Sequence, residues 1–207
     1  DGLLFSPLGL SNDDAGMLEV DFPVVLLGER IFDGPVDHVT MENVDAACAA
    51  TEHLIASGRR RIAVIGAHPG ETIGSAGLRV AGYRAALDAA AIAYDDQLII
   101  DAGPWHRVNG AEAMRRLLDR NVTFDAVFAL NDELALGALR VLRERSFDVP
   151  GDVSIIGFDD IDEAQYSLPS LTTVDPGRRE IARLAVETLL ARIRGTDAST
   201  VPQQIRS

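Results

Sequence analysis

The feature of this sequence that most constrains its fold is a regular alternation of short apolar runs with longer amphipathic stretches. The apolar runs have the length of strands and read GLLFS, PVVLLG, RIAVIG, QLIID, DAVFAL and VSIIGF. Apolar residues at helical spacing predict helices over about 43–57, 78–91, 107–120, 132–145 and 177–194. Strands that alternate with helices form parallel sheets with crossover helices, so the sequence predicts an α/β fold.

The strand-like runs and the residues at helix ends agree with this fold class. The runs are continuous in Val, Ile and Leu, as expected for strands that helices cover on both faces. Gly58 follows the first long helix and Gly195 follows the last, while Asp175-Pro176 offers a cap and a first-turn proline before the last helix.

Composition limits where such a chain works and what it can bind. A net charge of -13 argues against direct contact with a nucleic-acid backbone, and the Arg59–Arg61 cluster suits a helix C-terminus. A single cysteine, Cys48, fits a reducing compartment, and no apolar run approaches the roughly 20 residues of a membrane helix. We therefore expect a soluble cytoplasmic protein. The chain opens without Met and stops at VPQQIRS, which suggests a fragment cut at both ends.

Polar and aromatic residues follow four consecutive strand-like runs. Ligands of open α/β sheets bind beyond the carboxyl ends of the strands. The residues found there are Ser75 and Arg79, Trp105, Asn131 with Asp132, and Asp159 with Asp160. An indole covers a C–H face of a ligand, and the polar groups bond to its hydroxyls or ring nitrogens. The sequence therefore predicts a site for a small polar ligand at this edge.

Each of these residues also has a structural interpretation. Asn131 or Asp132 could serve only as a helix N-cap, and Asp159-Asp160 could only open the next helix or turn. Trp105 could be an ordinary packing residue. Convergence on one edge of the sheet favours the ligand site over these separate explanations.

The sequence offers little support for catalysis. It has no G-x-S-x-G elbow and no phosphate-binding glycine motif, and its four histidines are far apart. Cys48 has no paired base in the sequence. Asp159-Asp160 beside Asp162 and Glu163 leaves open a Mg²⁺ site of a phosphotransfer domain. We otherwise expect no catalytic residue, no metal and no cofactor.

Several segments together resemble one known family. In order, they are HLIASGRRRIAVIG, GLRVAGYRAAL, AVFALNDELALGALRVLRE, VPGDVSIIGFDD and PSLTTVDP. This order is similar to that of the effector-binding core of lac-repressor-type (LacI/GalR) transcription regulators. The resemblance implies a periplasmic-binding-protein-like fold of two lobes around a sugar- or nucleobase-sized effector. It implies a partial N-terminal lobe from residues 1–40 and 174–192, and a C-terminal lobe from residues 41–173 and 193–207.

The resemblance also assigns roles to individual residues. Arg79, Asn131 and Asp159 match effector-contacting positions, Ser75 lies close by, and Trp105 matches an aromatic wall position. The chain departs from the pattern at Gly28, where some sugar-binding members have an acid. It departs again at Asp-Pro-Gly 175–177, where many have Gln or an aromatic residue. These departures leave the identity of the effector open.

The function that the resemblance implies is ligand sensing in a homodimeric regulator that binds DNA through a headpiece absent from this chain. Leu136 falls among Glu133, Arg140 and Arg143 on the helical wheel, and the resemblance places it at the dimer interface. A periplasmic sugar-binding protein of a transporter is the alternative, because it shares the architecture. The N-terminal sequence of the full-length protein would distinguish the two, because a regulator begins with a helix-turn-helix segment and a periplasmic protein with a signal peptide.

Overall fold

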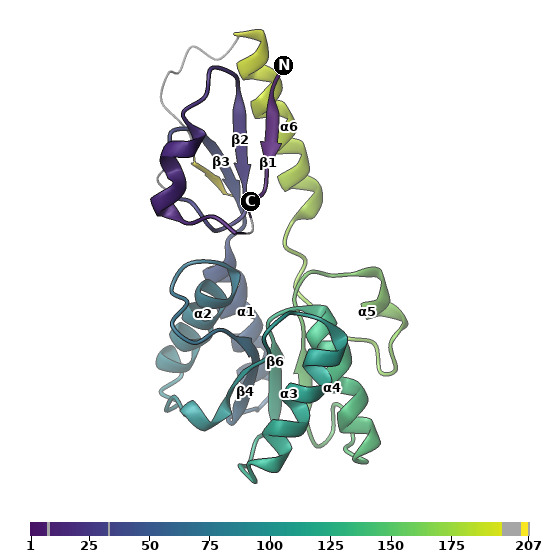
Figure 1. Ribbon diagram of the computed structural model, residues 1–207. Helices are drawn as coiled ribbons and strands as arrows, with labels where there is room; N and C mark the ends of the chain where they lie inside the picture. Colours follow the sequence, from purple (N-terminus) through teal and green to yellow (C-terminus); the bar gives the residue numbers. More distant parts are fainter. Residues whose placement is uncertain (8, 33, 196–203, 207) are drawn as a thin grey trace. The chain divides into compact units, whose positions relative to one another are not determined.

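The computed structural model describes residues 1–7, 9–32, 34–195 and 204–206 (Figure 1). The chain divides into two compact units. The first comprises residues 1–42, 73–75 and 177–207, and the second comprises residues 43–72 and 76–176. Each unit contains a four-stranded parallel sheet with flanking helices, so the predicted α/β fold class is confirmed.

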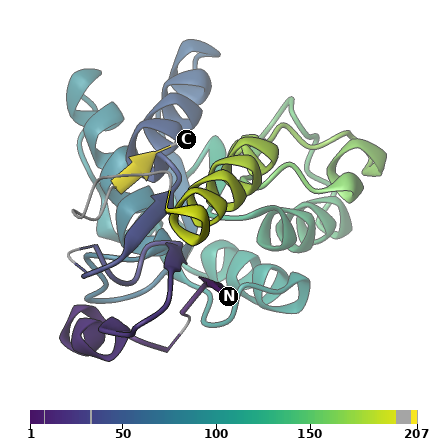
Figure 2. The same ribbon diagram turned by 90° about the horizontal axis from the view of Figure 1, so that it is seen from above.

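The sheet of the first unit has the order β1-β2-β3-β8. Its strands are β1 (Leu3–Phe5), β2 (Val24–Leu27), β3 (Asp37–Thr40) and β8 (Gln204–Arg206), accompanied by η1 (Asn12–Leu18) and α6 (Arg178–Arg194). Successive strand residues point to opposite faces. Val25 therefore packs with Ala185 of α6 on one face, while Leu26 packs with Leu18 of η1 on the other. Figure 2 shows α6 along this sheet.

The sheet of the second unit has the order β5-β4-β6-β7. The strands are β4 (Ile62–Ala67), β5 (Ile99–Asp101), β6 (Ala126–Ala129) and β7 (Ser154–Ile156). The helices are α1 (Asn43–Ala56), α2 (Ser75–Ala89), η2 (Asp96–Leu98), α3 (Arg107–Asp119), α4 (Asp132–Glu144) and α5 (Asp162–Tyr166). Beyond α5, Thr172 forms a parallel bridge with Ile156 of β7.

Helices cover both faces of the second sheet (Figure 1). Alternate residues of β4 and β6, such as Ile65 and Val127, pack with α3 and α4. The intervening residues Val64 and Phe128 point to the opposite face and are equally buried. Burial of both faces explains why these strands are continuous apolar runs in the sequence.

The six strands and five long helices expected from the sequence are present, but the sequence analysis missed β3 and β8. The β3 segment reads DHVT and lacks an apolar run. Its Asp37 is buried because Arg192 of α6 pairs with both carboxylate oxygens, at 2.6 and 2.8 Å. Polar residues in this strand are thus compensated by a partner that is distant in sequence.

Three expected boundaries are corrected. Residues 193–207 were assigned to the C-terminal lobe, but α6 and β8 belong to the first unit. The backbone of β8 pairs there with β3. Residues 196–203 and 207 lie outside the described residues. Helix α2 begins at Ser75, earlier than expected. The N-cap of α6 is Gly177, at φ 74°, and not Asp175. Within the described ranges, no helix combines the length and apolar character needed to cross a bilayer.

Gly137 permits the close packing of α3 and α4. A Cβ atom at Gly137 would lie 2.0 Å from the Arg107 carbonyl oxygen. Gly137→Ala should therefore lower the free energy of unfolding by about 1–3 kcal/mol through overpacking. At an uncrowded helical position, the same substitution would instead raise the free energy of unfolding by about 1 kcal/mol. Urea denaturation measures the difference.

Gly16→Ala is the control, because a Cβ atom there meets nothing within 4 Å. A Gly137→Ala protein as stable as the wild type would contradict the packing argument.

Candidate functional site

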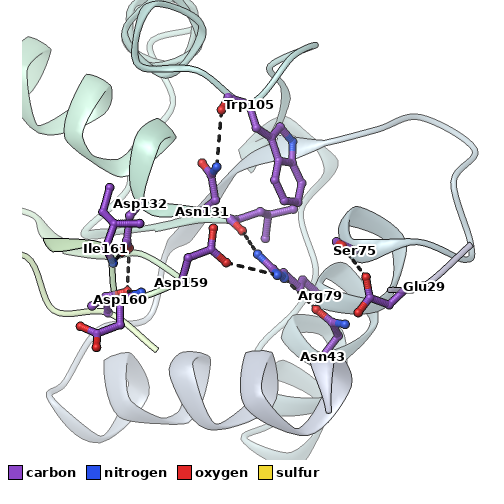
Figure 3. Close-up of polar contacts among 12 residues, drawn as sticks. Glu29, Asn43, Ser75, Arg79, Trp105, Asn131, Asp132, Asp159, Asp160 and Ile161 are labelled. Carbon is purple, nitrogen blue, oxygen red and sulfur yellow. Dashed lines mark hydrogen bonds and ion pairs between the residues drawn. The ribbon is translucent and has the colours of Figure 1, made fainter. Parts of the chain in front are cut away.

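The candidate site lies at the carboxyl edge of the second sheet, where the loops after four parallel strands begin. Arg79, Trp105, Asn131 and Asp159 come together there, and each contacts the next (Figure 3). Parallel strands place their carboxyl ends on one edge, which is why residues 80 positions apart become neighbours. Four of the five ligand-binding residues predicted from the sequence thus share one location.

Arg79 is at the centre of this group. Its side chain is 3% exposed. The guanidinium donates from Nε to Asn43 Oδ1 at 2.9 Å and from Nη1 to the carbonyl oxygen of Leu130. Its central carbon lies 3.6 Å from the ring centroid of Phe158. These contacts hold the cation in one position beneath the loops.

Asp159 is the accessible partner of this buried cation. Its Oδ1 lies 3.5 Å from Arg79 Nη2, and 34% of its side chain is exposed, so a ligand can reach the carboxylate. The backbone at Asp159 has φ 111°, a region that side-chain-bearing residues rarely adopt. Such conformations cost about 1–3 kcal/mol and cluster at functional sites.

Trp105 is held against β4 by its indole N–H. Nε1 donates to the Gly66 carbonyl oxygen at 3.0 Å, where the pairing of β4 with β5 shifts register. Gly66 has φ 113°, and a Cβ atom there would lie 2.7 Å from Leu134 Cδ1. The half-buried indole lies 5.4 Å from the Arg79 guanidinium and also packs on the core. Trp105 therefore combines a packing role with a wall beside Arg79.

Asn131 is a helix N-cap, as the structural interpretation predicted. Its Oδ1 accepts from Leu134 N at 2.8 Å, and its Nδ2 donates to the Trp105 carbonyl oxygen at 3.5 Å. The residue is buried and its amide already supports both α4 and the Trp105 loop. Direct contact of Asn131 with an effector stays a prediction.

Asp132 is a buried structural carboxylate. Its Oδ1 accepts from the Thr173 hydroxyl at 2.6 Å and its Oδ2 from Ile161 N at 2.9 Å. Burial raises the pKa of Asp132, while the bonds from Thr173 and Ile161 oppose that rise. A Cβ atom at Gly157 would lie 2.1 Å from Oδ1, so the glycine makes room for the carboxylate. Asp132 thus ties α4 to the loop after β7.

The acidic group after β7 gives no support to a Mg²⁺ site. Helix α5 begins at Asp162, and Ile161 rather than the Asp159-Asp160 pair occupies its N-cap position. Glu163 Oε1 accepts from Arg107 at 2.9 Å. In the part of the chain that the structure describes, no group of three or more His, Cys, Asp or Glu side chains is arranged to hold a metal ion.

Ser75 belongs to the first unit and contacts Glu29 there. Its Oγ donates to Glu29 Oε2 at 2.9 Å, and Thr40 Oγ1 donates to Oε1 at 3.3 Å. Glu29 is 6% exposed and follows the end of β2. Glu29 was not singled out from the sequence, whereas the neighbouring Gly28 was. A polar residue directly after an apolar run was the signal, as it was at Asn131.

His68 is a second residue that the sequence analysis missed. It is the first residue after β4, and its ring lies 5.7 Å from that of Trp105. The four histidines were set aside because they are far apart in the sequence, although the position of His68 after a strand was a usable signal. The partners Asn43 and Phe158 left no such signal, because they meet Arg79 only in the folded chain.

The arrangement is suited to binding a small hydroxylated molecule. An exposed carboxylate accepts hydrogen bonds from hydroxyl groups, and an adjacent indole covers C–H surface. The buried guanidinium fixes the carboxylate and is itself nearly inaccessible. Recognition by a few placed polar groups beside an aromatic wall is typical of small-molecule sites.

Comparison with known proteins gives consistent matches. A family model described as the periplasmic binding protein-like domain matches residues 51–206. The chain is 42% identical over 159 residues to the HTH-type transcriptional regulator CelR of Thermobifida fusca, which covers 74% of this chain and 46% of that protein. The chain thus spans about half the length of this curated relative.

Solved structures give the same result. A LacI-family transcriptional regulator from Sanguibacter keddieii has a TM-score of 0.89 at 54% identity, covering 100% of this chain and 75% of that chain. The complex of the transcriptional regulator CelR with cellobiose has a TM-score of 0.88 at 35% identity, covering 100% of this chain and 62% of that chain.

Asp132 and Asp159 should respond differently to the same substitution. In Asp132→Asn the amide nitrogen must face either Ile161 N–H, which cannot accept, or the Thr173 hydroxyl, which must then reverse its hydrogen bond, so one part-buried bond is lost or reversed. We expect a loss of about 1–3 kcal/mol in the free energy of unfolding. Asp159→Asn should cost less, because its carboxylate is partly exposed and Arg79 keeps its bonds to Asn43 and Leu130. Equal effects in thermal denaturation would contradict these separate roles.

Proposed function

The chain belongs to the LacI family of transcription regulators, and from this premise we propose that it is the effector-binding core of such a regulator. The observation that carries the proposal is the cluster of Arg79, Trp105 and Asp159 at one carboxyl edge. We assign the first unit to the N-terminal lobe and the second unit to the C-terminal lobe.

The effector that fits this cluster is a neutral sugar or a similarly hydroxylated metabolite. Arg79 is nearly inaccessible and already pairs with Asp159, so the cluster offers little uncompensated positive charge to an anionic ligand. The accessible carboxylate of Asp159 instead suits hydroxyl donors. The CelR relative was solved with cellobiose, which supports a saccharide here. A nucleobase-sized ligand is the second candidate.

Regulation rather than transport or catalysis is favoured by the relatives. Those named above are transcription regulators, which supports an effector-binding regulatory domain over a transporter's binding protein. With a net charge of -13, this chain is poorly suited to bind DNA itself. We therefore propose a cytoplasmic regulator that reaches DNA through a separate headpiece. The effector would act through its different affinities for two conformations.

A thermal-shift screen tests the proposed function. The panel contains cellobiose, other disaccharides, glucose, ribose and free nucleobases. A ligand present at 100 times its Kd should stabilise the protein by about 2.7 kcal/mol. Asp159→Asn should weaken binding of the active compound by about 1.5–3 kcal/mol, roughly tenfold or more, because a bond to a charged acceptor is lost. Asp160→Asn is the neighbouring control. Unchanged affinity in Asp159→Asn would remove this residue from the site.

A second surface of the larger unit supports the proposed homodimer. A shallow groove is lined by Leu136, Leu139, Arg140, Arg143, Glu144, Ser167 and Leu168. Leu168 of this groove and the nearby Tyr166 are each 79% exposed. The helical wheel placed Leu136 on the polar side of α4, whereas it is half-buried and packs against the core. An interface role for Leu136 and its neighbours stays a proposal.

Arginine substitutions test this surface. Leu136→Arg should shift the intact regulator toward monomer, because a two-fold interface would bring two like charges together without partners. Leu168→Arg should do the same without disturbing the core, because its side chain is largely exposed. Val108→Arg, at an exposed residue outside the groove, is the control. Sedimentation at micromolar concentration measures the outcome. A full dimer in both groove variants would exclude this interface.

A further inference from the structure

Both ring nitrogens of His68 face hydrogen-bond acceptors. Nδ1 lies 3.0 Å from Glu71 Oε2, and Nε2 lies 3.0 Å from the carbonyl oxygen of Gly103. A neutral imidazole carries one N–H and can donate to only one of these partners. An ionised carboxylate and a carbonyl group cannot donate in return. The two contacts are both hydrogen bonds only when the ring carries both protons.

These two bonds connect the loops that form the candidate site. Gly103 is two residues before Trp105, and Gly103 N donates to Asp101 Oδ1 at 2.7 Å. On the other side, Glu71 Oε1 accepts from Ala76 N at 3.2 Å and Gly77 N at 3.4 Å. Glu71 thereby fixes the first turn of α2, the helix that carries Arg79. His68 is the link between the start of α2 and the Trp105 loop.

The His68 ring also touches the indole directly. The two ring centroids lie 5.7 Å apart with an interplanar angle of 37°. From the side of α2, the Arg79 guanidinium approaches the same indole at 5.4 Å. The Trp105 wall is therefore supported by the Gly66 carbonyl, by Arg79 and by His68.

We propose that His68 is the positioning residue of the Trp105 wall, and that it holds the wall in place only while its imidazole carries both protons. The importance of this wall for effector binding rests on the proposed function. The positioning itself rests on the contacts of His68 alone. Loss of the proton breaks one of the two bonds and frees the Trp105 loop from the start of α2.

The charges around His68 set the pH range of this effect. Glu71 faces it from its own loop and Asp101 from the end of β5, while Arg116 of α3 donates to the Asp101 carbonyl oxygen. Burial alone lowers the pKa of His68, but the Gly103 carbonyl and the two carboxylates outweigh burial and raise it above its ordinary value. The stabilisation is therefore complete below about pH 6.5 and is lost as pH rises through the raised pKa.

The experiment uses Trp105 as its own reporter, because it is the only tryptophan of the chain. The fluorescence of the ligand-free protein is measured from about pH 5.5 to 9, a range in which histidine side chains lose their proton. The wild type should show one transition with a midpoint above about 6.5. His68→Gln should abolish it. His106→Gln is the matched control, because this exposed histidine adjoins Trp105 in the chain and its side chain makes no capping bond.

Glu71→Gln provides a second variant that keeps an oxygen for Ala76 N and Gly77 N while removing the charge. It should move the midpoint to lower pH by about one pH unit. Far-ultraviolet circular dichroism confirms that each variant is folded. The proposal is overturned if the wild type shows no transition, if the transition persists in His68→Gln, if His106→Gln removes it, or if Glu71→Gln leaves the midpoint unchanged. No sugar is added, so failure of the proposed effector binding would not alter this result.

Discussion

The buried guanidinium of Arg79 is the interaction on which the candidate site depends. A charge that is 3% exposed must be compensated by nearby dipoles and counter-charges. The compensation comes from Asn43 of α1, from the Leu130 carbonyl after β6 and from Asp159 after β7. Each partner belongs to a different segment, so satisfying the cation draws three segments to one point. Arg79 and Asp159 therefore contribute unequally to the fold. Removal of Arg79 leaves buried acceptors without donors, whereas Asp159 is partly exposed.

The loops around Arg79 are held by contacts that leave little freedom. Gly66 leaves space for the indole of Trp105, and Gly157 leaves space for the carboxylate of Asp132. Asp132 in turn binds the backbone of Ile161 beyond the unusual turn at Asp159. A ligand that meets such loops does not have to order them, which reduces the entropic cost of binding. Asn131 and Asp132, both considered as possible ligand contacts, take part in the same bonding around the site, and direct contact of Asn131 with an effector stays a prediction.

Sequence patterns predicted the fold well because the second sheet is buried on both faces. Runs such as RIAVIG and DAVFAL have few alternatives to a buried strand. Strand β3 was missed because its stability depends on pairing between Asp37 and Arg192, which are distant in sequence. Arg79, Trp105 and Asp159 were found by looking beyond the carboxyl ends of the strands, because parallel strands bring the loops at these ends together at one edge. This criterion could not separate a cap from a contact at Asn131. It could have pointed to His68, the first residue after β4, but not to the two acceptors that His68 meets on separate loops.

Charge pairing within the site bears on the kind of molecule it can accept. The cation of Arg79 lies against the carboxylate of Asp159, and a protonated His68 lies against the carboxylate of Glu71. Each positive group is thus balanced within the protein before a ligand arrives. A phosphate or carboxylate ligand would have to enter beside Asp159 and lose its hydration without gaining an accessible cation, which is unfavourable. Binding of a sugar is more favourable, because its hydroxyl groups donate to the accessible carboxylate and its apolar C–H face packs on the indole. The electrostatics of the second unit are therefore better suited to a neutral hydroxylated ligand than to an anion.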